Sequence, residues 1–172
     1  MTLAAHAYIK NETPDYYLQH YRSNHYQWNN DFSKTYRFLV GGEIAYPTQW
    51  VKPKLHVAFE NLTNYIYFDT NGLPQQADKN IQVLAADLQL NITTPWINLD
   101  NSIIYQHSSS EHLPLPTLVL YNNLYYYDTW VKALDVQIGV DMRFFSRYYA
   151  PVLNPALGQF CVQNVEKVGN YP

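Results

Sequence analysis

The chain has 172 residues, enough for one domain with a sizeable core, and its 11 Lys and Arg against 14 Asp and Glu leave a formal net charge of −3. This mild acidity gives no electrostatic case for a nucleic-acid partner, which usually needs a basic stripe. The single cysteine, Cys161, excludes an intrachain disulfide. No apolar stretch reaches the ~18 residues of a membrane-spanning helix, whereas Tyr, Phe and Trp, which favour pleated surfaces and membrane interfaces, make up 16% of the chain.

Apolar and polar residues alternate in segments of roughly ten or more residues, the pattern of β-strands with one apolar face. The match slips near residues 61–64, which we interpret as a bulge. Short links between consecutive strands indicate an antiparallel up-and-down meander, so the predicted fold class is all-β. The alternation predicts about eight strands, at residues 2–10, 34–46, 53–68, 82–93, 96–107, 117–128, 131–147 and 157–165.

The links between the predicted strands are alternately short and long. Residues 47–53, 93–96 and 128–130 form the short links, whereas the long links cover residues 11–34, 69–80 and 107–116. A meander of this kind has one end with tight turns and one end with long loops, which is typical of outer-membrane barrels.

Three of the four tryptophans, Trp50, Trp96 and Trp130, lie in the short links. An indole ring is amphipathic and settles at the boundary between lipid and water, so these residues predict an interface girdle. The opposite strand ends predict a second girdle of Tyr65, Tyr67, Phe68, Tyr105, Phe144, Phe145, Tyr148 and Tyr149. The alternative for both aromatic sets is that they plug the two ends of a soluble sandwich.

In each predicted strand, every second residue belongs to a polar set, and this set carries charges in the middle of the strands. The chain also has few Lys and Arg for a soluble exterior. We therefore expect the polar side of the strands to line a lumen, where charged walls tune ion selectivity. The apolar side would face lipid. A soluble lipocalin-like barrel would have the opposite orientation. The predicted lumen and selectivity residues are Arg37, Glu43, Asp87, Asp135, Asp141 and Arg143.

The region from residue 131 onward contains the strand GVDMRFF, then Tyr148 and Tyr149, and finally NPALGQF and VGNYP. Together with SNHYQWNNDF and NYIYFD upstream, these pieces resemble the Putative porin family of Bacteroidota outer membranes. The resemblance implies a transmembrane barrel of the cell outer membrane with a pore role. A family member would add a signal peptide and more strands, so residues 1–172 resemble a single segment of a larger barrel.

Several polar clusters invite a catalytic or metal-binding interpretation. The stretch HSSSEH at residues 107–112 lacks the nucleophile turn of a serine hydrolase, and the histidine pairs have no metal-site signature. We expect no enzyme, metal or cofactor. The long segment 11–34 is the best candidate for ligand contact, by stacking on sugar rings or narrowing a lumen, or else a self-packed loop; its aromatic residues are Tyr16, Tyr17, Tyr21, Tyr26 and Trp28.

The sequence therefore predicts a porin-like barrel whose partners are the lipid bilayer and small polar solutes that diffuse passively. Two alternatives stay open: a soluble lipocalin-like barrel that binds an apolar small molecule, and a non-conducting surface or adhesion barrel.

Overall fold

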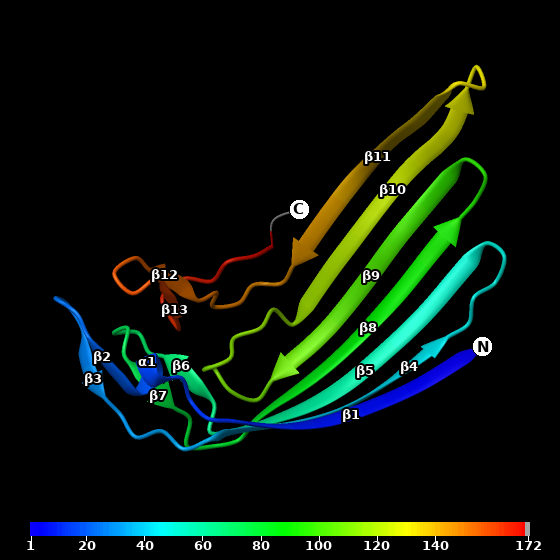
Figure 1. The fold of residues 1–172 in the computed structure, drawn as a ribbon. Helices are drawn as coiled ribbons and strands as arrows, with labels where there is room; N and C mark the ends of the chain where they lie inside the picture. Colours follow the sequence, from blue (N-terminus) through cyan, green and yellow to red (C-terminus); the bar gives the residue numbers. More distant parts are fainter. Residues whose placement is uncertain (171–172) are drawn as a thin grey trace.

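The computed structural model describes residues 1–170, and its main feature is one long antiparallel sheet. Each strand pairs with its neighbours in chain order, so the predicted all-β meander is confirmed (Figure 1). The strands of this sheet, in order, are β1 (Thr2–Glu12), β4 (Thr35–Ala45), β5 (Val51–Thr63), β8 (Ile81–Thr93), β9 (Ile97–Ser108), β10 (Leu118–Trp130) and β11 (Leu134–Phe145).

The sheet is open at both sides. Among residues 1–170, the edge strands β1 and β11 each pair with only one neighbouring strand, β4 and β10 respectively. No helix in this part of the chain is long and apolar enough to cross a membrane.

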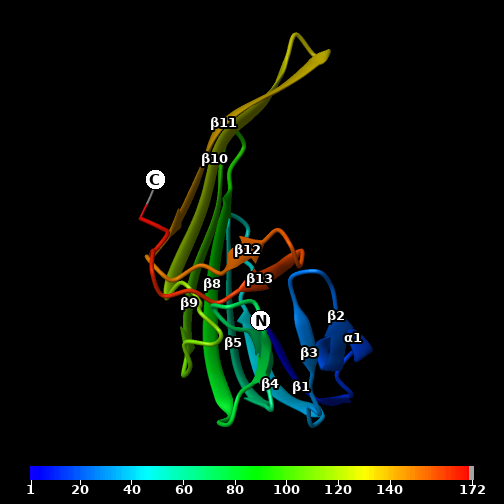
Figure 2. The same cartoon turned by 90° about the vertical axis from the view of Figure 1, so that its left-hand side faces the viewer.

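The remaining elements gather at one end of the sheet, where they form what we call the loop layer: residues 13–34, 64–80, 109–117 and 146–170. Figures 1 and 2 show these elements at the end opposite the tight turns and on one side of the sheet. The loop layer contains α1 (Tyr16–Gln19), β2 (His20–Arg22), β3 (Gln27–Asn29), β6 (Ile66–Phe68), β7 (Pro74–Gln76), β12 (Val152–Asn154) and β13 (Gln159–Cys161).

Two of the three tight turns share one local sequence. In each of these turns a threonine lies three residues before the next strand, and a tryptophan lies just before that strand. Thr48 Oγ1 accepts a hydrogen bond from Val51 N–H at 3.1 Å, and Thr94 Oγ1 accepts one from Ile97 N–H at 3.0 Å. The third turn has positive φ at Val131 (53°) and Lys132 (58°), the geometry of a type I′ hairpin.

Two strand predictions were wrong. The predicted strand 157–165 is reduced to β13, which pairs with β12 and β6 in the loop layer, because Gly158 has a left-handed φ of 64° and the chain turns there. The slip near residues 61–64 is the end of β5 rather than a bulge, because Asn64 has a φ of 59° and directs the chain out of the long sheet into β6.

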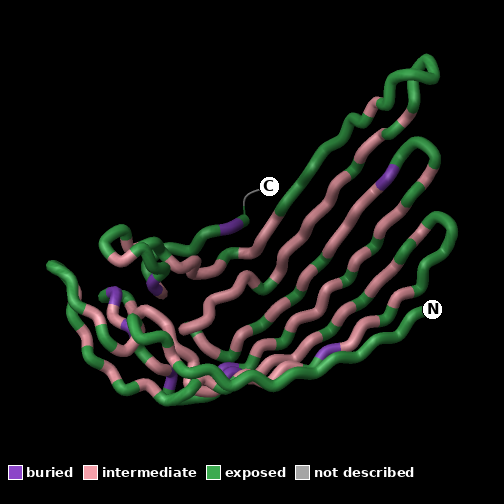
Figure 3. The backbone as a smooth tube through the Cα atoms, viewed as in Figure 1, coloured by how far each residue is buried: buried purple, intermediate pink, exposed green. Residues whose placement is uncertain are grey.

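Buried residues are few (Figure 3). Most lie in the loop layer or at its junction with the sheet, whereas Gly41 and Asn98 are buried within the long sheet. Leu62 and Ile81, from β5 and β8, pack with Ala77 of the loop layer. Partly buried Tyr65, Tyr67, Val83 and Leu113 surround this cluster. Most of the long sheet therefore has no protein layer packed against it, unlike a sheet in a soluble sandwich.

Candidate functional site

The strand register places the six predicted lumen residues on one face of the long sheet, which we call the polar face. Directly opposed residues in antiparallel strands point to the same side. Arg37 lies opposite Leu62, and Leu62 lies opposite Ile81. The same row of opposed pairs continues through β9 and β10 to β11, so the polar face carries Arg37, Glu43, Asp87, Asp135, Asp141 and Arg143.

The charges near β4 are paired across adjacent strands. Arg37 forms an ion pair with Glu60 of β5, and its guanidinium lies 5.7 Å from the ring centroid of Tyr8. Glu43 Oε2 lies 2.9 Å from Lys54 Nζ. These pairs lower the net charge of this part of the face.

The carboxylates farther along the sheet accept hydrogen bonds from uncharged side chains. Asp87 accepts from Gln89 Nε2–H at 2.7 Å and from Ser102 Oγ–H at 2.8 Å. Asp135 accepts from Thr129 Oγ1–H at 2.7 Å. Such partners hold each carboxylate in place without neutralising its charge.

Asp141 and Arg143 lie on the edge strand β11, and both side chains are exposed. Their Oδ1 and Nε atoms are 3.4 Å apart, and the Arg143 side chain is 75% exposed. The Arg143 guanidinium also lies 5.4 Å from the ring centroid of Tyr121. Both charges are therefore accessible on the polar face.

Sequence reasoning missed a histidine pair on the polar face, between the edge strand β1 and β5. The rings of His6 and His56 are stacked, with centroids 5.5 Å apart and planes 2° from parallel. The His6 side chain lies over Gly41. A Cβ atom added to Gly41 would lie 2.8 Å from two atoms of the His6 ring. A glycine inside a strand often marks such a close approach, so the Gly41–Gly42 pair was the available signal.

The opposite face of the sheet, which we call the apolar face, is exposed. Ile138 and Val140 of β11 are 63% and 71% exposed, so they do not pack into a central core. Their neighbours Gln137 and Asp141 point to the polar face, since successive strand residues alternate. The large apolar-face side chains that are exposed include Leu3, Ile9, Val40, Ile44, Leu55, Val57, Leu84, Leu88, Leu90, Ile103, Leu124, Leu134, Ile138, Val140 and Met142.

Trp50, Trp96 and Trp130 are all exposed at the tight-turn end of the sheet. Backbone hydrogen bonds join two of these turns to the next hairpin, from Thr93 N–H to Trp50 O and from Tyr127 N–H to Trp96 O. Of the aromatic residues expected in a second girdle, Tyr105 and Phe144 lie on the apolar face, and Phe145 lies on the polar face. The others lie in the loop layer: Tyr65, Tyr67, Phe68, Tyr148 and Tyr149.

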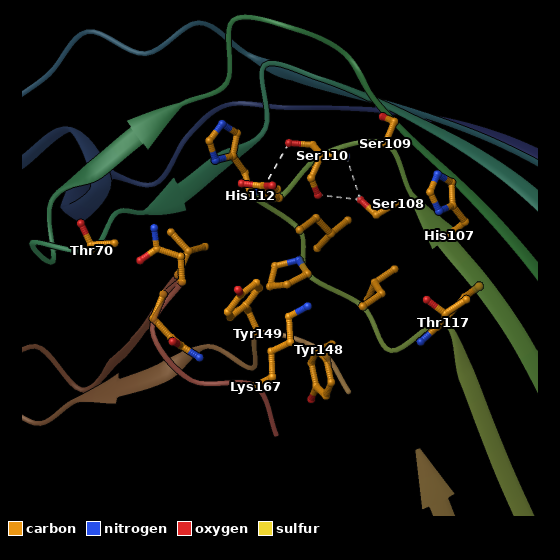
Figure 4. Close-up of a pocket in the computed structure, with 18 residues that line it drawn as sticks. Thr70, His107, Ser108, Ser109, Ser110, His112, Thr117, Tyr148, Tyr149 and Lys167 are labelled. Carbon is orange, nitrogen blue, oxygen red and sulfur yellow. Dashed lines mark hydrogen bonds between the residues drawn. The ribbon is translucent and has the colours of Figure 1, made fainter. Parts of the chain in front are cut away.

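The HSSSEH stretch lines a pocket of about 420 Å³ between the β9–β10 loop and the C-terminal segment (Figure 4). Its serine hydroxyls form hydrogen bonds with backbone groups of the loop and of β8. Ser108 Oγ–H donates to Ser110 O at 3.0 Å, and Ser109 Oγ accepts from Gln82 N–H at 2.8 Å. The ring of His112 stacks on Tyr67 at 4.1 Å. These contacts hold the β9–β10 loop against β8 and the rest of the loop layer.

The predicted ligand-contact residues of segment 11–34 are split by the structure. Tyr17, Tyr21 and Trp28 line one pocket in the loop layer. Tyr16 instead packs against His20, with ring centroids 5.1 Å apart. The Tyr26 hydroxyl accepts a hydrogen bond from Asn154 Nδ2–H at 2.8 Å, so it fastens this segment to the C-terminal part of the loop layer.

Burial alters the pKa values of three groups in the loop layer. Desolvation raises the pKa of the Tyr65 hydroxyl and, together with Asp69 and Asp78, that of Tyr67. It also raises the pKa of the Cys161 thiol, with Asp69 adding to the shift and a hydrogen bond to Asn154 opposing it. Residues 1–170 contain no group of three or more His, Cys, Asp or Glu side chains placed to hold a metal ion.

Comparison with known families gives one result for the whole chain. The family model described as Putative porin matches residues 1–172. No curated protein and no solved structure matches the chain significantly.

Proposed function

The chain belongs to the Putative porin family, and from this premise we propose that it forms part of the wall of an outer-membrane barrel through which small polar solutes diffuse passively. The observation that carries the proposal is the difference between the two faces of the sheet. One face exposes rows of Leu, Ile and Val side chains, whereas the other carries charges and amides. Exposed apolar patches of this extent mark a surface that contacts lipid or another protein.

Strand length supports a bilayer as the partner of the apolar face. The seven strands have 11 to 13 residues each, at or above the ~9–11 residues with which a tilted strand crosses the hydrocarbon core. The exposed Trp50, Trp96 and Trp130 at the tight-turn end fit an interface girdle at the polar boundary of that core.

The position of the loop layer supports the pore over a lipocalin-like barrel. Leu62 and Ile81, which the loop layer covers, point to the same side as Arg37 and Asp87. The loop layer therefore folds over the polar face, as a loop that narrows a lumen would. In a soluble barrel that binds an apolar molecule, the apolar face would be the enclosed one.

The sheet edges indicate how the wall continues. In hydrocarbon every backbone N–H and C=O needs a partner, so the free edges of β1 and β11 must each pair with a strand. With seven strands that alternate in direction, β1 and β11 run parallel, and pairing them with each other would break the antiparallel pattern. We infer that further antiparallel strands of a larger barrel extend the sheet at both edges.

Cysteine labelling at two adjacent positions tests which face meets lipid. In a Cys161→Ser background, Val140→Cys lies on the apolar face and Asp141→Cys on the polar face. After reconstitution into vesicles, we expect a fluorophore at position 140 to be quenched by brominated lipids. A membrane-impermeant maleimide should label position 141 much faster than position 140. Lipid quenching at position 141 together with faster maleimide labelling at position 140 would contradict the proposal.

Two further outcomes separate the alternatives. A chain that stays monodisperse without detergent and takes up an apolar dye supports the lipocalin-like barrel. A chain that inserts with the expected orientation but never conducts ions in planar bilayers supports the surface or adhesion barrel.

A further inference from the structure

An aromatic pocket of about 450 Å³ lies in the loop layer, where three separate segments meet. Segment 13–34 and β6 contribute four aromatic side chains, Tyr17, Tyr21, Trp28 and Phe68, and two leucines complete the apolar lining. The polar side chains of the lining are Asp15 and Gln159, and no Lys, Arg or His belongs to it.

Three of the four rings of this pocket contact one another. Tyr21 stacks on Trp28 with centroids 4.5 Å apart, and Trp28 meets Phe68 at 68° with centroids 6.1 Å apart. The Trp28 Nε1–H donates to Tyr17 O at 2.9 Å, which fixes the orientation of the indole. Tyr21, Trp28 and Phe68 are therefore positioned before any ligand arrives.

The segments that form the pocket are fastened to one another outside it. Asn154 Nδ2–H donates to the Tyr26 hydroxyl at 2.8 Å, which joins segment 13–34 to the C-terminal part of the loop layer. Gly72 allows this close approach, because a Cβ atom there would lie 2.8 Å from Asn154 Nδ2 and 3.1 Å from Leu157 Cδ1. A binding site built in this way loses little freedom when it is occupied.

The Asp15 carboxylate is available to a ligand. Asp15 precedes α1 but makes no side-chain capping hydrogen bond. It belongs to none of the ion pairs in residues 1–170, and it is exposed at the pocket. The pocket therefore combines aromatic walls with one negative charge that no basic lining residue balances.

We propose that this pocket binds an organic cation of the quaternary ammonium class. The faces of Trp and Tyr rings attract cations, and the attraction grows when the cation is desolvated. Methyl groups on the nitrogen would contact the rings and the two leucines, while Asp15 supplies the opposite charge. A saccharide fits less well, because the Trp28 N–H is already engaged and only Asp15 and Gln159 offer planar polar groups. This inference needs only the loop layer and does not depend on the pore.

Calorimetric titration of the full chain in a polyoxyethylene detergent tests this proposal, since that detergent contains neither choline nor sugar. The probes are choline, its uncharged isostere 3,3-dimethylbutan-1-ol, and maltose. We expect choline to bind saturably and the isostere to bind about ten-fold more weakly, which corresponds to about 1.4 kcal/mol.

Two variants locate the site. Asp15→Asn should weaken choline binding about ten-fold, because it removes the charge and keeps the shape. Asp31→Asn is the matched control, since it removes the same charge from the same segment at an exposed position outside the pocket, and it should leave binding unchanged. Circular dichroism checks that both variants fold.

Three results would overturn the proposal: equal affinity for choline and its isostere, unchanged binding in folded Asp15→Asn, or saturable binding of maltose with none of choline. The last result would assign the pocket to saccharides instead.

Discussion

The imidazole rings of His6 on β1 and His56 on β5 lie parallel at a centroid distance of 5.5 Å, although β4 runs between their strands. The contact exists because Gly41 of β4 has no side chain in the path of the His6 ring. His56 also lies opposite Glu43 and Asp87 in the two neighbouring strands. The pair therefore joins three strands beside Glu43 and Asp87 on the polar face.

Replacing Gly41 should break this contact. In Gly41→Ala the new Cβ would lie 2.8 Å from the His6 ring and 3.2 Å from Val57 O, so we expect the free energy of unfolding to fall by about 1 kcal/mol. Urea unfolding of the protein in lipid vesicles measures the change. Gly42→Ala is the matched control, because its Cβ would meet only Ala4 O at 3.6 Å, and it should cost little. Equal losses in the two variants would argue against a role for the His6 contact.

Reversing a charge on the polar face should change ion selectivity. Arg143→Glu places a negative charge beside Asp141 at an accessible position, and we expect the reversal potential in planar bilayers under a salt gradient to move toward cation preference. Arg37→Glu should act in the same direction, since it also leaves Glu60 without its partner. Lys132→Glu, the same change of charge in the β10–β11 turn, is the control. An ion preference that does not respond to either arginine would contradict placement in a lumen.

Local patterns predicted the long sheet well, because alternation along a strand fixes which residues share a face. To place the six charges on one face, we needed only the alternation along each strand and antiparallel pairing between strands. Both are present in the structure. The ends of the strands were harder. Asn64 adopts a left-handed conformation without being glycine, so the chain leaves β5 at a position where the residue pattern shows only a slip.

Contacts between distant segments could not be predicted from the sequence. The stacking of His6 on His56 depends on the register of β1 with β4 and of β4 with β5, which alternation alone does not fix. The aromatic pocket depends on Phe68 and Gln159 meeting segment 13–34. Composition showed that this segment is rich in aromatic residues, but it could not show how the rings are arranged. In the structure Tyr21 and Trp28 stack on one another, whereas Tyr16 lies outside the pocket.

The β10–β11 turn should tolerate a stabilising substitution. Val131 has a φ of 53°, a conformation that is costly for a β-branched residue. Asn and Gly favour the two central positions of a type I′ turn, so Val131→Asn combined with Lys132→Gly should raise the free energy of unfolding by about 1 kcal/mol. Urea unfolding in vesicles measures this effect. Thr48→Gly in the β4–β5 turn should act oppositely, because it removes the hydroxyl that accepts from Val51 N–H.

The stability of the loop layer should fall in alkaline solution. Burial raises the pKa of the Tyr65 hydroxyl above its ordinary value of 10, so the folded protein holds this proton at pH values where the unfolded chain releases it. Its contribution is therefore fully present below pH 10 and is lost as the pH rises through the higher pKa of the folded state. Tyrosinate absorbance near 295 nm, followed with the loop-layer transition in urea, measures both events. Tyr65→Phe removes the ionisable group that packs against Leu62, Ala77 and Ile81. The loop layer of this variant should therefore lose less stability between pH 9 and 11 than that of the unchanged protein. An identical decline in the two proteins would assign the alkaline sensitivity to other groups.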